Sequence, residues 1–198
     1  MEKLFKVVNV TLDPDTANSK LILSEDQKQV SHKGQRQILP DKPERFDRFP
    51  GVLGKEGFSS GRFYYEVLVS GKTKWMLGVA RESNTRKGRI TACPENGYWT
   101  MCLRNKTKYE ACTFPHARLS VKQAPQKVGV FVDYEEGLVC FYDVEAKSLI
   151  YSFTDQCFTD KLYPLFCPFL NDGGRNSAPL IITPVEQSEI LFHQNSAM

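Results

Sequence analysis

The stretch KVGVFVDYEEGLVCFYD, residues 127–143, decides the fold class. It predicts two strands joined by a tight turn, because runs of apolar residues flank Glu135-Glu136-Gly137. In each strand apolar side chains fill both alternating sets of positions, so both faces of the predicted hairpin need a cover. Gly137 suits the turn because glycine readily adopts the positive φ that a short loop with a bulge requires. We therefore expect this hairpin in the middle of a two-layer sheet structure.

The composition is that of an ordinary globular protein. Of the 198 residues, 41% are hydrophobic, 12% aromatic and 25% charged, a mixture that supports a core and favours strands. The formal net charge is +3, too small to predict binding to nucleic acid or a membrane surface from bulk electrostatics. No run reaches the ~18 apolar residues of a membrane span, and the N-terminus lacks a signal-peptide pattern. We expect one cooperative unit, cytoplasmic and without membrane insertion.

The cysteines predict neither a disulfide framework nor a zinc site. All six lie nine or more positions apart in the chain, and none forms a Cys-x-x-Cys pair. A chain of this length can build its own core without covalent links. We therefore expect reduced, unpaired cysteines, with Cys140 acting as a small core residue inside the central hairpin.

Strand signals extend along most of the remaining chain. The alternation over residues 63–69, followed by Gly71 and the segment WMLGVA at 75–80, predicts a second hairpin. In GYWTMCLR, residues 97–104, alternation predicts that one set faces the core and the other faces outward: Trp99, Met101 and Leu103 inward, and Tyr98, Thr100, Cys102 and Arg104 outward. Shorter strands are expected within residues 8–14, 20–24, 25–37, 149–153, 162–170 and 179–183. No long window has a helical period, so the fold class is all-β, an antiparallel β-sandwich.

Several short motifs occur in one order along the chain. They are LDP at 12–14, YYEV at 64–67 and VDYE at 132–135, supported by WMLGVA at 75–80, ENGYW at 95–99, KYEA at 108–111, LYPLF at 162–166 and NDGG at 171–174. On these motifs the chain resembles a PRY-SPRY (B30.2) domain, the module found in tripartite-motif ubiquitin ligases and butyrophilins. The resemblance covers about residues 7–185. Tyr64 departs from the tryptophan usual in the family, a conservative change.

The resemblance implies a fold and its parts. The family fold is a bent antiparallel β-sandwich, concanavalin-like, with an N-terminal PRY segment packed on the SPRY part. Carried to this chain, it gives a PRY segment at 1–58, a SPRY domain at 59–185 and a polar C-terminal tail at 186–198. The first two are expected to fold as one unit.

The sequence contains no pattern typical of catalysis. The three histidines are far apart, and there is no G-x-S-x-G, no P-loop and no metal-ligand spacing. Asp133 and Glu135 lie at the hairpin turn, where a solvated tip is the expected role rather than an acid/base pair. We therefore expect no enzyme activity, no cofactor and no metal in these residues. Ubiquitin transfer by a parent protein would need a RING-type zinc domain elsewhere.

For binding, the resemblance implies a shallow pocket on one sheet, walled by variable loops. It places Met76, Cys102, Arg104 and Leu170 there, with Asn171 and Asp172 in the loop that follows. These residues differ from those of antibody-Fc-binding and phosphoantigen-binding relatives, which argues against both ligands. Arg104 is expected to pair with a carboxylate or phosphate, and Met76 to offer an adaptable apolar contact.

Basic residues surround Arg104 in the sequence and are predicted to form an electropositive rim: Arg86, Lys87, Arg89, Lys106 and Lys108. A run of solvated charge is the commoner reason for such a cluster. The prediction is a module that recognises a protein partner, as the target-binding end of a tripartite-motif ubiquitin ligase in innate immunity whose parent oligomerises through a coiled coil outside these residues. Two alternatives stay open: a sensor of a phosphorylated small molecule or RNA, and a self-association module.

Overall fold

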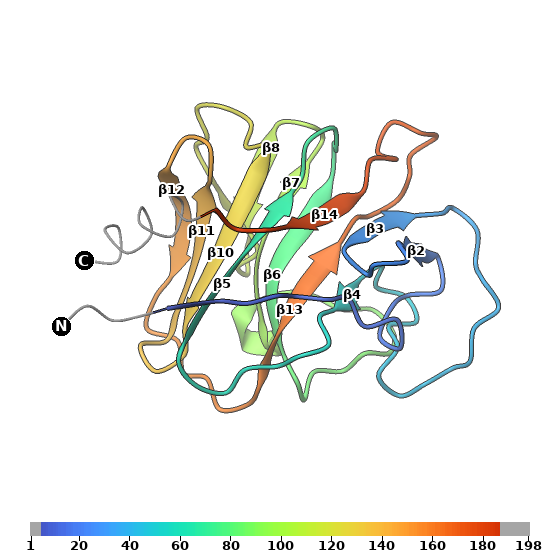
Figure 1. Cartoon of the computed structure of the whole chain (residues 1–198), viewed down its shortest axis with the longest axis horizontal. Helices are drawn as coiled ribbons and strands as arrows, with labels where there is room; N and C mark the ends of the chain where they lie inside the picture. The colour runs from blue at the N-terminus through green and yellow to red at the C-terminus, as the bar shows by residue number, and fades with distance from the viewer. Residues whose placement is uncertain (1–4, 187–198) are drawn as a thin grey trace.

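Two stacked sheets make up the computed structural model, which describes residues 5–186 (Figure 1). The eight-stranded sheet has the order β12-β11-β10-β5-β14-β3-β2, and β1 pairs with β5 beside this path. Its strands are β1 Lys6–Val7, β2 Leu21–Leu23, β3 Gln29–His32, β5 Arg62–Leu68, β10 Lys127–Asp133, β11 Leu138–Asp143, β12 Ser148–Phe153 and β14 Leu180–Thr183. All pairings are antiparallel except the short β1–β5 contact.

The second sheet has six strands in the order β4-β13-β6-β7-β8-β9. Its strands are β4 Val52–Leu53, β6 Trp75–Arg81, β7 Tyr98–Arg104, β8 Lys108–Ala111, β9 Ala117–Arg118 and β13 Leu162–Cys167. A single 3-10 turn, Pro94–Asn96, precedes β7 in the described part of the chain. The expected antiparallel β-sandwich is confirmed.

The central hairpin is where the sequence predicts it. Strands β10 and β11 pair from Val128↔Asp143 to Asp133↔Leu138, and β10 lies between β11 and β5. Gly137 has φ 65°, and a Cβ added there would lie 1.9 Å from the carbonyl oxygen of Gln156. The turn therefore requires glycine for its backbone angle and for the close approach of a neighbouring segment.

The second predicted hairpin is wrong. Strand β5 pairs with β10 and β14 in the eight-stranded sheet, whereas β6 pairs with β7 and β13 in the other sheet. The turn at Gly71 thus carries the chain from one layer to the other. The side chains of the two strands meet face to face, and Tyr65 Oη donates a hydrogen bond of 2.6 Å to the Gly78 carbonyl across the layers. Alternation alone cannot distinguish strands that pair edge to edge from strands that stack.

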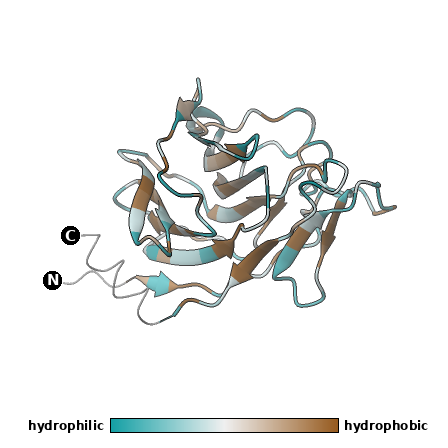
Figure 2. Cartoon of the chain, turned by 90° about the horizontal axis from the view of Figure 1, so that it is seen from above, coloured by the Kyte–Doolittle hydropathy of each residue, from teal (hydrophilic) through white to brown (hydrophobic). Residues whose placement is uncertain are grey.

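The main core lies between the sheets, where hydrophobic strands face one another (Figure 2). It includes one set of alternating positions from each central strand: Phe63, Tyr65 and Val67 from β5; Trp75, Leu77 and Val79 from β6; Trp99, Met101 and Leu103 from β7; Val128, Val130 and Val132 from β10. The inward set predicted for β7 is therefore confirmed. Burial of this many large side chains dominates the stability of the fold.

The N-terminal part departs most from expectation. The strand predicted within residues 8–14 is wrong: β1 ends at Val7, and Leu12 forms only an isolated bridge to Gly54. Asp13 and Pro14 break the extended run, since proline lacks the N–H that a ladder needs. The short strands expected at 20–24, 25–37, 149–153, 162–170 and 179–183 are present as β2, β3, β12, β13 and β14. The predicted tail, 186–198, lies outside the described residues except for its first residue.

Two further expectations are settled by local contacts. All six cysteines are free, as predicted, and Cys157 alone among them is exposed. The solvated role expected for Asp133 is wrong, because its carboxylate is buried and forms a 2.6 Å ion pair with Arg62 Nε. Within residues 5–186, no helix has the length and apolar character needed to cross a membrane.

Candidate binding site

The outer face of the six-stranded sheet, the face turned away from the other sheet, holds the predicted site residues. The register pairs Cys167 with Met76, Met76 with Cys102, and Cys102 with Glu110. Directly paired residues point to the same side of a sheet, so this row of four crosses the outer face from β13 to β8. The sandwich therefore supplies a rigid support for anything placed on it.

Most of this face is covered by the protein itself. Met76 is 5% exposed and Cys102 is fully buried, and both belong to a second apolar cluster with Phe46 and Phe49. Tyr98, Thr100 and Cys102 were expected to face outward. Their exposure to solvent is wrong, because all three are buried. Alternation correctly assigns the side chains of β7 to two opposite faces of the strand. The segment around residues 44–53, however, packs onto the outer face. Cys102 consequently offers no surface to a partner, and Met76 very little.

Basic side chains line the open end of the outer face. Arg104 pairs with Lys108 across β7 and β8, and both are exposed. Lys74 directly precedes β6 at the position that continues the register toward Arg104, and its Nζ lies 4.3 Å from the ring centre of Phe169. We call Lys74, Arg104 and Lys108 the basic row. Cations over an aromatic ring are attracted to its face, so Lys74 and Phe169 hold each other in place.

A pinned loop borders the basic row. Asn176 is buried, and its amide donates to the carbonyls of Lys74, Pro168 and Leu170 while its oxygen accepts from the N–H groups of Thr73 and Lys74. Leu170, in this loop, is 57% exposed. An exposed leucine on a fixed loop is the type of apolar anchor that recognition surfaces use. We call Leu170, Phe169 and the basic row the recognition patch.

The other two predicted loop residues have different surroundings. Asn171 donates to the carbonyl of His32 at 3.3 Å and accepts from Gly174 N–H at 2.6 Å, so its side chain already shapes the loop. Asp172 is exposed and has φ 53°. Asn171 is therefore partly engaged within the protein, whereas Asp172 can face a partner.

The predicted basic rim divides into two groups. Lys87 forms a 2.7 Å ion pair with Asp41, and Arg86 donates to the Glu44 and Glu82 carbonyls and lies 5.4 Å from the ring centre of Phe46. These two residues fasten their loop to the segment that covers the outer face. Arg89, Lys106 and Lys108 are exposed. Only Lys108 belongs to the basic row. Sequence reasoning missed Lys74 and Phe169, although Lys74 directly precedes one predicted strand and Phe169 lies within another.

Two hollows of the described surface lie elsewhere. One, of about 410 Å³, is lined by residues that include Asp13, Leu53 and Tyr163. The other, of about 570 Å³, is lined by residues that include Ile38 and Arg48. Neither includes Met76, Cys102 or Arg104 in its lining. The residues predicted to form the shallow pocket therefore lie outside both of these hollows.

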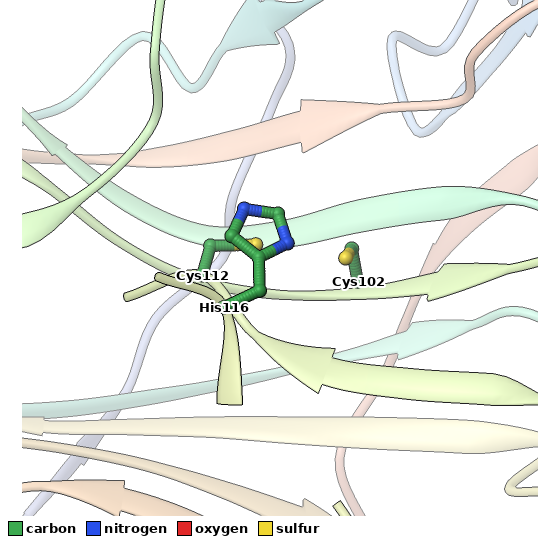
Figure 3. A group of neighbouring side chains, drawn as sticks. All are labelled: Cys102, Cys112 and His116. Carbon is green, nitrogen blue, oxygen red and sulfur yellow. The ribbon is translucent and has the colours of Figure 1, made fainter. Parts of the chain in front are cut away.

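Three potential metal ligands converge next to the basic row (Figure 3). The sulfur atoms of Cys102 and Cys112 and a ring nitrogen of His116 lie within 4.8 Å of one another. The pKa of the Cys102 thiol is lowered, first by a hydrogen bond with Cys112 and then by Arg104, against the opposing effect of burial. The same hydrogen bond, together with burial, raises the pKa of Cys112. Sequence spacing gave no metal-ligand pattern here, because three separate positions meet only in the folded sheet.

Comparisons with known proteins identify the family of this chain. The family model of the SPRY domain matches residues 62–180, and that of the SPRY-associated domain, PRY, matches residues 10–58. Human erythroid membrane-associated protein is 51% identical over 175 residues, which cover 88% of this chain and 37% of the relative. The E3 ubiquitin-protein ligase TRIM21 of Bos taurus is 47% identical over 180 residues, 90% of this chain and 38% of the ligase. The chain therefore spans well under half the length of these two relatives.

A solved structure has the same architecture. The crystal structure of the TRIM65 PSpry domain aligns with a TM-score of 0.76, covering 90% of this chain and 92% of that one at 24% identity. At this identity the likeness supports the fold alone. The arrangement of the two sheets is thus that of a known domain type.

Proposed function

This chain belongs to the SPRY-domain family and carries the associated PRY segment, and from that premise we propose that it recognises a protein partner through the recognition patch. A SPRY domain is a binding module rather than a catalytic fold. The observation that supports the site is the combination of an exposed leucine with a row of cations on a rigid sheet. Such a surface suits a partner that presents an apolar side chain beside carboxylates.

Each part of the patch has a distinct task in this proposal. Leu170 and Phe169 bury the partner's apolar anchor. Arg104 fixes its orientation, because a guanidinium can hold a carboxylate through two parallel hydrogen bonds. Lys74 and Lys108 contribute long-range attraction and speed association more than they tighten the complex. Met76 and Cys102, which were expected to touch the partner, serve instead as the buried support under Arg104.

The cellular role we propose follows the relatives. The chain acts as the target-binding end of a longer protein of the tripartite-motif ubiquitin ligase type, in the cytoplasm and in innate immunity. The E3 ubiquitin-protein ligase TRIM21 of Bos taurus is a relative that supports this proposal. Transfer of ubiquitin would then belong to other parts of the parent, which oligomerises through its own coiled coil.

A reversal of charge at Arg104 tests the site. We expect Arg104→Glu to weaken capture of the partner by more than about tenfold, or about 1.4 kcal/mol, with unchanged thermal stability because the side chain is exposed. The measurement is a quantitative pull-down from cell extract followed by titration with the captured protein. Lys161→Glu is the matched control, since Lys161 is an exposed cation just before the opposite end of β13. Equal capture by both variants would remove the patch from the proposal.

The basic row favours one alternative, a sensor of a phosphorylated small molecule or RNA. Three cations in a row would neutralise phosphates, and binding of that kind weakens steeply as salt rises. A protein partner anchored on Leu170 would depend much less on salt. A titration over a range of salt concentrations, with a short RNA and with the captured protein, separates the two functions.

A further inference from the structure

We propose that Cys102, Cys112 and His116 form a binding site for zinc on the outer face of β7 and β8. The site is independent of the proposed partner binding. Its basis is the convergence of two thiols and one imidazole within 4.8 Å, with the two cysteines fully buried and the histidine at the surface. Figure 3 shows the imidazole ring of His116 over the side chain of Cys112, with Cys102 to the right. Thiolate and imidazole are the ligands that zinc prefers in proteins.

The strand register brings these ligands together. Cys102 pairs with Glu110, and Cys112 continues β8 by donating its N–H to the Thr100 carbonyl at 3.0 Å. Cys102 and Cys112 are therefore diagonal neighbours on one face of the sheet. The chain then turns back, and Ala117 pairs with Ala111. That turn returns His116 to the level of Cys112, in a Cys-x-x-x-His sequence.

The same register favours a metal over a disulfide. Diagonal neighbours on paired strands have Cα atoms about 7–8 Å apart, whereas disulfides span at most about 6.8 Å. A zinc ion bridges more easily, because two Zn–S bonds of about 2.3 Å in tetrahedral geometry leave the sulfurs about 3.8 Å apart. Both thiols are free in the structure. Two thiolates with one neutral imidazole also balance the charge of Zn²⁺, so the buried site carries no net charge.

Two neighbouring groups complete the environment. The carboxylate of Glu110 lies 2.8 Å from Nδ1 of His116, and a carboxylate beside an imidazole makes it a better metal ligand. The hydroxyl of Thr100 is buried next to Cys112, close enough for a hydrogen bond to its sulfur. A metal-bound thiolate would accept that hydrogen bond, as the sulfurs of many zinc sites do.

The surface position of His116 gives the ion a way in. Its side chain is 29% exposed, and water can take the fourth position on that side, as it does in zinc sites with three protein ligands. Binding would fasten the 112–116 turn to β7, two residues from Arg104. The site thus steadies the strand that carries the basic row without contacting a partner.

Cobalt binding tests the proposal, because Co²⁺ replaces zinc and reports its ligands by absorption. We expect one equivalent of Co²⁺, added to the reduced, metal-free 198-residue chain, to give a thiolate charge-transfer band and the absorption of a tetrahedral ion, and one equivalent of Zn²⁺ to abolish both. His116→Ala and Cys112→Ser should each lower the affinity by at least about 100-fold, more than the loss of an outer partner does. Glu110→Gln should lower it by about 10–100-fold.

The controls separate binding from folding. Cys157→Ser removes the exposed thiol elsewhere in the chain and should leave the cobalt spectrum unchanged. His116→Ala alters a surface side chain, so its metal-free thermal unfolding should match that of the unmodified chain. Absence of the charge-transfer band at one equivalent overturns the proposal. A band that persists in His116→Ala and Cys112→Ser but is lost in Cys157→Ser also overturns the proposal.

Discussion

The outer faces of the two sheets are both apolar, yet they are covered in different ways. On the eight-stranded sheet, Tyr64, Phe131, Cys140 and Tyr142 form a small cluster against Phe5, Val7 and Val185, from the two ends of the described chain. On the six-stranded sheet, the cover comes from the C-terminal part of the PRY segment, through Phe46 and Phe49. That second cover stops short of the open end of β6 and β7, where the recognition patch begins.

The difference shows how one fold can keep its core constant and vary its binding surface. The first cover is made of strands and chain ends that complete a sheet. The second is an irregular segment held by side chains: buried Arg45 donates to the carbonyls of Pro14, Ala17 and Pro40. Loops on a rigid support tolerate changes in sequence that strands do not. The outer face of the six-stranded sheet is therefore the place where specificity can change.

Removing one buried ring from the apolar cluster on each outer face gives the largest expected effect. Phe46→Ala and Phe131→Ala should each lower the free energy of unfolding by about 3–5 kcal/mol, through lost burial and a cavity. Both rings are buried, at 0% and 4% exposure, so denaturant unfolding should give similar losses. Only Phe46→Ala should also weaken partner capture under conditions where both variants are folded. Equal loss of capture in Phe131→Ala would contradict the contrast between the faces.

Lys72 allows the stability of the loop beside the recognition patch to be tested through its dependence on pH. Its Nζ donates to the carbonyls of Asn176 and Ala178 and so ties the loop of Leu170 to the sandwich. Burial lowers the pKa of Lys72 to about 8 from an ordinary value of 10.5. The unfolded chain therefore binds more protons than the folded chain between these values, and the contribution of Lys72 to stability rises as pH increases above about 8.

The matching measurement compares the unmodified chain with Lys72→Met. The difference between their unfolding free energies should change in favour of the unmodified chain as pH rises from about 8. It is best followed below the ordinary tyrosine pKa of 10.0, where the buried tyrosines do not yet contribute. A difference that stays constant over this range would mean that Lys72 carries no shifted pKa.

Leu170 gives the smallest expected change in stability. Leu170→Ser should alter the free energy of unfolding by less than about 0.5 kcal/mol, as is usual for exposed positions, while it weakens partner capture. Leu149→Ser is the matched control: Leu149 is 55% exposed, against 57% for Leu170, and lies on β12 at the edge of the other sheet. If both variants capture the partner equally well, Leu170 is not its anchor.

The strands could be predicted wherever their apolar pattern was strong, but their partners could not. Residues 127–143 are apolar on both faces and joined by a short turn, so local information was enough for the hairpin. Residues 63–69 and 75–80 have equally clear alternation, yet they stack in different sheets. Pairing depends on segments far away in the chain, such as β13 and β14, and no local period encodes that choice.

The candidate site was predictable only in part, for the same reason. Arg104 and Leu170 are exposed as expected, because a charged strand end and a polar loop seldom lie in a core. Cys102 was expected to face solvent but is buried. The segment that covers it, around Phe46 and Phe49, is more than fifty positions earlier in the chain, so local alternation could not indicate this cover. Lys74 and Phe169 meet across two strands, although nothing in either segment indicates the other.

The sequence by itself determined that this protein is a β-sandwich of the PRY-SPRY type with reduced cysteines, because alternation, turn residues and ordered motifs are local properties. Only the tertiary structure decided which face is open, which cations align and which thiols meet a histidine. Those features arise from strand register and from the packing of a distant segment, and the free energy that selects them comes from burial summed over the whole chain.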